Sequence, residues 1–448
     1  MLWEFSKKFQ FAADKIIPDS FVFCIILTLI VFVLGLVLTG TGPLDMVLHW
    51  YSGLWSMIAF AFQMSFMVIC CGAAAKAPQI ERLLSKLAKL PKSSSMAMVI
   101  LLVFGFISSL INWAFSLIIT PILAMQLSKN VKGLHFPLMI AAGYSTMVLG
   151  QCWCPSASVY ALLASKGHFM EESIGILTQA TTTYNPVNTV LWFILVGFTI
   201  LLCAFLTKPS PDEIVVYEGT SESESIATLE DEAEEKTIAD KMNQSRFLMI
   251  IIGIAGVVYI IHSFVTKGFI PSLNFNFVIF IFLTLNTFLY NTPEKFVTAI
   301  RESMKPATQV MLQFPFYGGI MGMMSGSGLT HVLADALVQV ATVKTLPFFS
   351  YLSASIVNLF VPSQGGQWIV QGPILVEAAK TMNADLPLII NAFVYGDEAT
   401  NLIQPLYVIP ALSLVGMKLK DVWGFMAFIW FGWFIVTSIG LLVLPGLF

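Results

Sequence analysis

Long apolar runs follow one another from position 21 to position 444, and they restrict the fold more than any other feature. Several of them reach the length of about 20 residues that a helix needs to cross a bilayer. A transmembrane barrel would instead show segments of about 10 residues with alternating hydrophobicity. Only 11% of the residues are charged, against about 25% in soluble domains. The sequence therefore predicts an all-α polytopic membrane protein.

The longest apolar runs are predicted to be full spans. They lie at 21–38, 54–75, 137–165, 186–206, 247–265, 275–290, 309–324, 387–415 and 422–444. Two further regions, 96–127 and 348–379, each consist of two short apolar arms around a polar middle. Paired short arms are typical of re-entrant hairpins. Two full crossings in each region would fit the same sidedness, so this alternative stays open.

The basic residues predict the orientation of the chain. With a cytoplasmic N-terminus, only Lys166, Lys267, Lys344 and Lys380 fall on the far side, and the other 23 − 4 = 19 bases lie in cytoplasmic segments. This bias follows the positive-inside rule. The C-terminus is then periplasmic or extracellular, and the acidic segment 207–245 is a cytoplasmic linker. Because the bases are spread over many loops, no nucleic-acid partner is expected.

An internal repeat occurs at an offset of 250 residues. Gln63 matches Gln313 and Pro137 matches Pro387, since 313 − 63 and 387 − 137 both give 250. Each unit holds four predicted spans and one hairpin, and the extra span at 246–266 makes the second unit start on the opposite side. We therefore expect residues 1–206 and 267–448 to form an inverted-topology repeat with two discontinuous helices. Many secondary transporters have this architecture.

An acid pair interrupts the predicted span 387–415. Asp397 and Glu398 follow Gly396 in the middle of this apolar run, where ionisable groups are costly. A helix break at Gly396 and a bound ion or polar ligand would reduce that cost. We expect ion coupling through Asp397, Glu398 and Thr400 together with Asn112 and Asn358, by Na⁺ binding or by protonation. The alternative is a shallow span, with the acids at the membrane interface.

The two hairpin tips and the two broken helices are expected to meet near the middle of the membrane. Their hydroxyl and amide groups could bind a carboxylate substrate. The predicted substrate-binding residues are Ser109, Asn112, Trp113, Ser156, Ser158, Asn358, Ser363, Gly365, Gly366, Gln367, Trp368, Asn401 and Gln404; further candidates are Ser108, Ser145, Thr146, Gln151 and Gln364. A serine or threonine in a membrane helix often bonds to its own backbone instead. Gly365 and Gly366 could simply form a tight turn, and the two tryptophans could simply pack.

No Lys or Arg is placed in the middle of a predicted span. An anionic substrate would then be neutralised by helix N-termini, hydroxyl groups and a co-bound cation, or it would enter protonated. Coupling to Na⁺ or H⁺ follows from either case. No catalytic motif stands in a suitable context, so an enzyme is not expected. Neither a cofactor nor a structural metal is expected, apart from transiently bound Na⁺.

Four motifs carry a resemblance to a known family. They are INWAFSL at 111–117, QFPFYGGI at 313–320, VPSQGGQWIVQGPI at 361–374 and YGDEATNLIQP at 395–405. With them the chain resembles the bacterial short-chain fatty acid transporter family, which belongs to a larger group of ion transporters. The resemblance implies symport of a short-chain monocarboxylate such as acetoacetate or butyrate with H⁺ or Na⁺. It also implies a homodimer of elevator type in the bacterial inner membrane. The alternatives are a Na⁺/H⁺ or other ion exchanger of the same group, and a passive channel.

Overall fold

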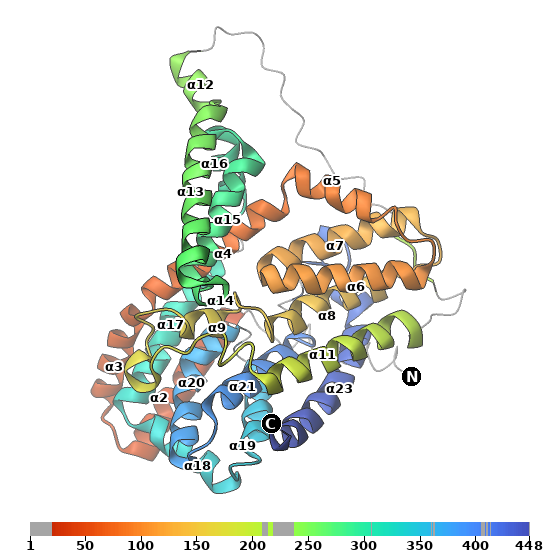
Figure 1. Cartoon of the computed structure of the whole chain (residues 1–448). Coiled ribbons are helices and arrows are strands. Elements are labelled where there is room, and N and C mark those ends of the chain that lie inside the picture. Colours follow the sequence, from red (N-terminus) through yellow and green to blue (C-terminus); the bar gives the residue numbers. More distant parts are fainter. Residues whose placement is uncertain are drawn as a thin grey trace.

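The computed structural model describes residues 20–207, 214–217, 237–305, 307–359, 361, 363–404, 408, 411–412 and 414–447. Within these residues every regular element is a helix and no strand occurs (Figure 1). The predicted all-α class is therefore confirmed. Most of the predicted acidic linker at 207–245 lies outside the described residues, and so does Pro405.

The helices of the first part of the chain are often preceded or opened by a proline. Proline suits the first helical turn because the N–H that it lacks would be unbonded there. The elements are α2 (Ser20–Leu34) with its π-helical end η1 (Gly35–Thr39), α3 (Pro43–Ser56), α4 (Ile58–Ala75), α5 (Pro78–Leu87), α6 (Ser94–Ile111), α7 (Trp113–Asn130), α8 (Phe136–Gln151), α9 (Ser158–Leu163), α10 (Glu171–Ile174) and α11 (Pro186–Ile200) with η2 (Leu201–Leu206).

The second part of the chain is also helical. Its elements are α12 (Ile238–Asn243), α13 (Arg246–Lys267), α14 (Phe269–Ser272), α15 (Phe275–Tyr290), α16 (Pro293–Glu302), α17 (Ala307–Gly326), α18 (Leu329–Val340), α19 (Leu346–Asn358), α20 (Gln364–Met382), α21 (Leu386–Asn401) and α23 (Leu419–Val443) with η4 (Leu444–Gly446).

Several helices have the length and composition of membrane spans. Among the described residues five qualify in full, at Ile58–Ala75, Ser94–Ile111, Pro186–Leu206, Ile238–Lys267 and Leu419–Gly446. Cys24–Thr39, Phe275–Tyr290 and Leu329–Val340 are shorter apolar helices. Four of the predicted spans, 54–75, 186–206, 247–265 and 422–444, coincide with full-length candidates. The arm α6 is long enough to cross the membrane, so the structure leaves open whether that hairpin is re-entrant.

The predicted span 54–75 is in fact two elements. Met57 leaves the helical conformation (φ −104°, ψ 2°), so that α3 ends at Ser56 and α4 begins at Ile58. The sequence analysis did not predict α3, which packs closely on α17. A Cβ on Gly53 would lie 2.3 Å from the carbonyl oxygen of Gly318. Glycines at this contact let the two backbones approach, as is common between membrane helices.

The first predicted hairpin is formed by α6 and α7, which lie side by side (Figure 1). Asn112 alone separates them, and its side-chain oxygen accepts hydrogen bonds from the backbone N–H groups of Ala114 (2.8 Å) and Phe115 (3.3 Å). This side chain therefore caps α7 at its N-terminus, as asparagine commonly does. Ser108 and Ser116 join the two arms below the tip through a hydrogen bond of 2.9 Å.

The second hairpin is formed by α19 and α20, and the described residues between these helices are Leu359, Val361 and Ser363. Ser363 caps α20 by accepting a hydrogen bond from the N–H of Gly366 at 3.3 Å. Deeper in the hairpin, Gln367 donates to the carbonyl oxygen of Ala354 at 2.8 Å. The tip is thus held by capping and by a side chain that crosses between the arms.

Two predicted spans are interrupted by helix breaks. In the span 137–165, α8 ends at Gln151 and α9 begins at Ser158. In the span 387–415, the break expected at Gly396 does not occur, because α21 stays helical through Gly396 and ends at Asn401. Both α8 and α21 have 16 residues, and their first residues are 386 − 136 = 250 positions apart. The equal lengths and the constant offset support the predicted repeat, while its inversion and the sidedness of the termini stay predictions.

Candidate functional site

The acid pair lies at the centre of the site. Asp397 and Glu398 sit near the C-terminal end of α21, and both are 0% exposed. Gly396 lets α21 approach α19 here, because a Cβ at this position would lie 2.3 Å from the carbonyl oxygen of Tyr351. The complete burial does not fit the alternative of ordinary interfacial acids. These carboxyl groups are instead held inside the protein.

Neutral amide groups surround the acid pair. The Asn401 side-chain nitrogen donates to Asp397 Oδ2 at 3.0 Å and to Glu398 Oε2 at 3.1 Å. Gln364 at the start of α20 donates to Glu398 Oε1 at 2.9 Å. No basic side chain pairs with either acid among the described residues, where His331 and Glu377 form an exposed ion pair elsewhere. The pair is therefore hydrogen-bonded but not neutralised by a fixed positive charge.

Asn358 connects the tip of the second hairpin to α21. Its side-chain nitrogen lies 2.7 Å from the Asp397 carbonyl oxygen, 3.0 Å from Thr400 Oγ1 and 2.8 Å from Asn401 Oδ1. An amide nitrogen has only two hydrogens for these three acceptors. The hairpin tip, the acid pair and the helix end therefore form one polar cluster.

Two oxygens of this cluster, Asp397 Oδ1 and Asn358 Oδ1, have no hydrogen-bond partner among the described residues. Gln367 Oε1, in the second hairpin, also has none there, and all three oxygens are buried. Buried polar atoms are bonded in the large majority of cases. All three are acceptors, and oxygens from a carboxylate and amides are suitable ligands for a hard monovalent cation or partners for a proton.

The first hairpin tip forms a different cluster. Asn112 donates to Met67 Sδ at 3.1 Å and to Ser156 Oγ at 3.3 Å. Ser156 itself donates to the carbonyl oxygen of Ile111 at 3.0 Å, and Cys154 lies 3.1 Å from its hydroxyl. The tip of α6 and α7 is thereby fixed to the segment between α8 and α9. This cluster contains no carboxyl group.

Hydrogen bonds join the two parts of the chain at the site. The Gln364 side-chain oxygen accepts from the N–H of Val159 at 3.0 Å, so this residue bridges α9 and Glu398. The hydroxyl of Tyr144 on α8 donates to the carbonyl oxygen of Asn401 at 2.8 Å. The predicted meeting of the broken helices is thus seen as direct contact between α8, α9 and α21.

The predicted site residues divide into three groups. The cluster around the acid pair contains Asn358, Asp397, Glu398, Thr400 and Asn401, with Gln404 buried just beyond the end of α21. The first hairpin cluster contains Asn112 and Ser156, while Trp113 is half-buried in the first turn of α7 and Ser158 begins α9.

The third group has local structural contacts. Ser109 donates to the carbonyl oxygen of Phe106 at 2.8 Å, as expected for a serine that bonds to its own helix. Ser363 caps α20, and Trp368 packs edge-on against Phe393 with ring centroids 5.0 Å apart. Gly365 and Gly366 lie in the first turn of α20 against Phe60 and Tyr317, while Gln367 bonds to Ala354 and Gln371.

The sequence analysis missed three residues that join the two parts. These are Tyr144, Tyr160 and Asn391; the Tyr160 hydroxyl donates to Asn391 Oδ1 at 2.8 Å. Asn391 is a single amide in the apolar stretch before the acid pair. Its position inside a predicted span was the available signal, because an unpaired amide there would be costly.

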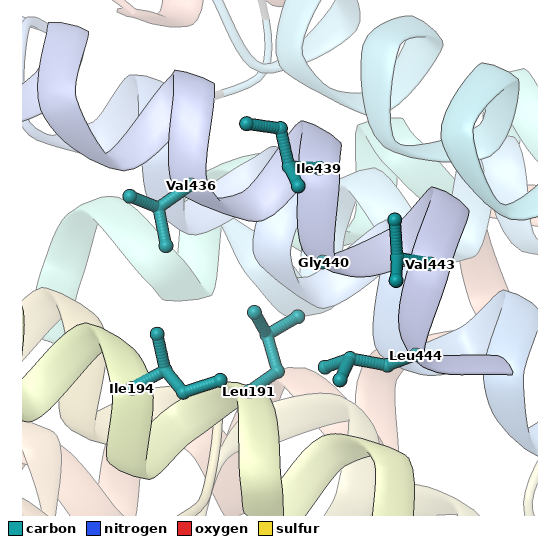
Figure 2. A pocket seen from close by; sticks show the side chains of 7 residues that line it. All are labelled: Leu191, Ile194, Val436, Ile439, Gly440, Val443 and Leu444. Atoms are coloured by element: carbon teal, nitrogen blue, oxygen red, sulfur yellow. The ribbon is translucent and has the colours of Figure 1, made fainter. Parts of the chain in front are cut away.

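An apolar cavity lies away from these clusters, between α11 and the end of α23. Its volume is about 230 Å³, and Figure 2 shows its lining of Leu191, Ile194, Val436, Ile439, Gly440, Val443 and Leu444. Three of these side chains, Ile194, Ile439 and Val443, are exposed. The lining offers no polar side chain for a carboxylate, and it includes none of the predicted site residues.

The comparisons with known proteins agree on one family. The model of the family described as "Short chain fatty acid transporter" matches residues 1–444. A protein of Escherichia coli (strain K12) that is assigned by name to short-chain fatty acid transport is 30% identical over 91% of this chain and 92% of its own length. A protein of the same name from Haemophilus influenzae is 31% identical over 92% of this chain and 93% of its own length.

Two solved structures share the fold. The YdaH transporter of Alcanivorax borkumensis aligns with a TM-score of 0.59 at 14% identity, covering 96% of this chain and 99% of that one. The MtrF efflux pump of Neisseria gonorrhoeae aligns with a TM-score of 0.50 at 13% identity, covering 97% of each chain. At these identities the likeness concerns the fold alone.

Proposed function

The chain belongs to the short-chain fatty acid transporter family, and we propose that it is a secondary active transporter that moves a short-chain monocarboxylate together with Na⁺ or H⁺. It is a multi-pass membrane protein, and its family and relatives are transporters rather than enzymes. The coupling, the substrate and the direction of transport are the proposed parts of this function.

One observation carries the proposal, namely the fully buried acid pair with only neutral donors around it. A buried carboxylate without a cationic partner is unfavourable unless a proton or a metal cation neutralises it. The unpartnered oxygens of Asp397 and Asn358 offer ligands for such a cation. Cation binding would then remove negative charge from the site and allow an anionic carboxylate to bind beside it.

The substrate carboxylate would bind between the two hairpin tips. Here α7 and α20 both begin, and the first-turn N–H groups of a helix favour an anion. The side chains of Asn112 and Ser156 on one side and of Asn358 on the other donate to other protein atoms, and they would exchange those bonds for bonds to the carboxylate. A second candidate function is Na⁺/H⁺ exchange, which the same acid pair would support without any organic substrate.

Transport assays in proteoliposomes distinguish these functions. Purified protein is reconstituted, and uptake of labelled butyrate and acetoacetate is measured under separate Na⁺ and H⁺ gradients, with protein-free liposomes as the control for passive diffusion. We expect saturable accumulation driven by one of the two gradients, and counterflow against unlabelled acid. An exchanger would show no counterflow of either acid, and a channel would show no accumulation against a gradient.

The location and assembly complete the proposal. We place the protein in the bacterial inner membrane as a homodimer, with a cytoplasmic N-terminus and a C-terminus on the outer side, in line with the distribution of basic residues. Cysteine labelling from either side of oriented vesicles, with single cysteines placed near Lys89 and Lys166, tests this orientation. The reagent should reach the first position only from the cytoplasmic side and the second only from the outside.

A further inference from the structure

The helices α8 and α21 can be compared position by position. They have the same length and begin 250 residues apart. With this offset Asp397 corresponds to Met147, Glu398 to Val148, and Asn401 to Gln151. The acid pair of the second part therefore corresponds in the first part to Met147 and Val148, whose side chains do not ionise.

The same hydrogen-bonding geometry serves different acceptors in the two helices. In α21 the Asn401 amide donates back by one turn to Asp397 Oδ2 at 3.0 Å. In α8 the Gln151 amide donates back by one turn to Met147 Sδ at 3.7 Å. An amide donor is present in both helices, but a carboxylate oxygen is replaced by a thioether sulfur.

The asparagines of the two hairpin tips have different acceptors. Asn358 has three oxygen acceptors within 3.0 Å, including the carbonyl oxygen of Asp397. Asn112 donates to a sulfur, Met67 Sδ at 3.1 Å, and to one hydroxyl oxygen, Ser156 Oγ at 3.3 Å. The side-chain oxygen of Asn112 accepts from the first turn of α7, whereas that of Asn358 has no partner among the described residues.

The chemistry of these atoms assigns cation binding to one part only. A thioether is a weak, soft acceptor that suits ions such as Cu(I), whereas a hard monovalent cation needs oxygen ligands. Within the acid pair, both oxygens of Glu398 and Oδ2 of Asp397 accept hydrogen bonds from amides. Only Asp397 Oδ1 has no partner among the described residues.

We infer that each chain binds a single monovalent cation per transport cycle, at Asp397 Oδ1 beside the tip of α19 and α20. The first hairpin cluster around Asn112 and Ser156 binds none, and neither does the segment of α8 around Met147. This inference rests on the proposed function. One cation and one monocarboxylate anion carry no net charge together, so transport is electroneutral and does not respond to the membrane potential.

The test uses reconstituted full-length protein with labelled butyrate. Initial uptake is measured while Na⁺ is varied at fixed pH, and again while pH is varied without Na⁺, which identifies the coupling ion. The inference expects a Hill coefficient of about 1 for that ion. It also expects the same steady-state accumulation with and without an inside-negative potassium diffusion potential.

Two coupled cations would give a different result. Each cycle would then move one net positive charge, and about 100 mV corresponds to about 2.3 kcal/mol per charge, or about 50-fold in accumulation. A Hill coefficient near 2 or an increase of this size would overturn the inference and leave the proposed symport intact. Loss of all gradient-driven uptake would instead refute the proposed function, and the inference with it.

A pair of variants locates the cation independently of stoichiometry. Asn358→Ala removes a cluster residue with an unpartnered oxygen, and the half-saturating concentration of the coupling ion should rise at least about 10-fold, the equivalent of one lost ligand interaction. Met147→Leu removes the thioether at the corresponding place in α8 and should leave that concentration unchanged. An equal shift in both variants would show that the first cluster also binds a cation.

Discussion

Replacing Asp397 by asparagine tests whether its charge drives transport. The side chain of Asp397 is fully buried, and its Oδ2 accepts a hydrogen bond of 3.0 Å from Asn401. An asparagine has almost the same shape and keeps one oxygen that can accept this bond. The substitution Asp397→Asn therefore removes the charge while it preserves the packing between α21 and α19.

The size of the effect follows from the burial of the site. Removing one partner from a buried ion pair costs about 3–5 kcal/mol, which lowers the affinity for the coupling cation by roughly two to three and a half orders of magnitude. The folded state loses little, because no basic side chain pairs with Asp397 among the described residues. We expect the free energy of unfolding of the Asp397→Asn variant in detergent to change by less than about 1 kcal/mol, the value of one ordinary hydrogen bond.

Uptake of labelled butyrate in proteoliposomes at varied cation concentration measures the affinity for the coupling cation. A thermal unfolding curve of the purified protein measures the free energy of unfolding. The matched control is Asp335→Asn, which removes an exposed carboxylate from α18 and should leave uptake within about twofold of the parent protein. Near-normal accumulation by Asp397→Asn, with an unchanged half-saturating cation concentration, would refute the assignment of the acid pair.

Three further predictions concern the packing and bonding of the same region. Gly396→Ala puts a Cβ 2.3 Å from the Tyr351 carbonyl oxygen and should lower the free energy of unfolding by about 1–3 kcal/mol; Gly197→Ala, with no atom within 4 Å of its added Cβ, is the control and should not destabilise. Gln364→Leu removes the donor to Glu398 and should cost about 2 kcal/mol or more, seen as lower thermal stability and weaker uptake; unchanged values would show that this bridge is not needed. All six cysteines are buried, so a maleimide should label them only after unfolding, and rapid labelling of the folded protein would contradict the described packing.

Much of the fold was predictable because apolar length and polar interruptions are strong signals in a membrane protein. Interrupted helices were predicted in the spans 137–165 and 387–415, since polar residues and prolines stand there in otherwise apolar runs. The position of the second break was wrong, because it was expected at Gly396 and α21 continues through the acid pair to Asn401. The hairpin tips were predicted at the polar middles of 96–127 and 348–379. The all-helical class followed from the length of the apolar runs.

Other elements could not be predicted from these signals. The amphipathic helices α5 and α16 carry both charged and apolar side chains, so a search for apolar runs passes over them. The helix α3 depends on contact with α17 through Gly53 and Gly318, and such a contact is not encoded in the local sequence. Tertiary contacts of this kind determine helix boundaries more than local preference does.

The candidate site was predicted as a set of residues but not as a network. The sequence indicated that Asp397, Glu398 and Asn358 belong together, because ionisable and amide groups in apolar spans need partners. It gave no means to place Gln364 between Val159 and Glu398, or the hydroxyl of Tyr144 on the end of α21. The bonds from Gln364 to Val159 and from Tyr144 to Asn401 join residues more than 200 positions apart, and only the folded chain brings them together.

The bonds between α8, α9 and α21 also restrict how a bound molecule can be passed across the membrane. A motion that pulled α8 and α9 away from α20 and α21 would leave the buried side-chain oxygen of Gln364, the N–H of Val159 and the hydroxyl of Tyr144 without partners. Each group left without a partner in a dry interior costs about 1–3 kcal/mol. A motion in which α8, α9, α20 and α21 move together as one rigid body leaves these hydrogen bonds in place. The hydrogen bonds between the two parts of the chain therefore oppose an opening that separates α8 and α9 from α20 and α21.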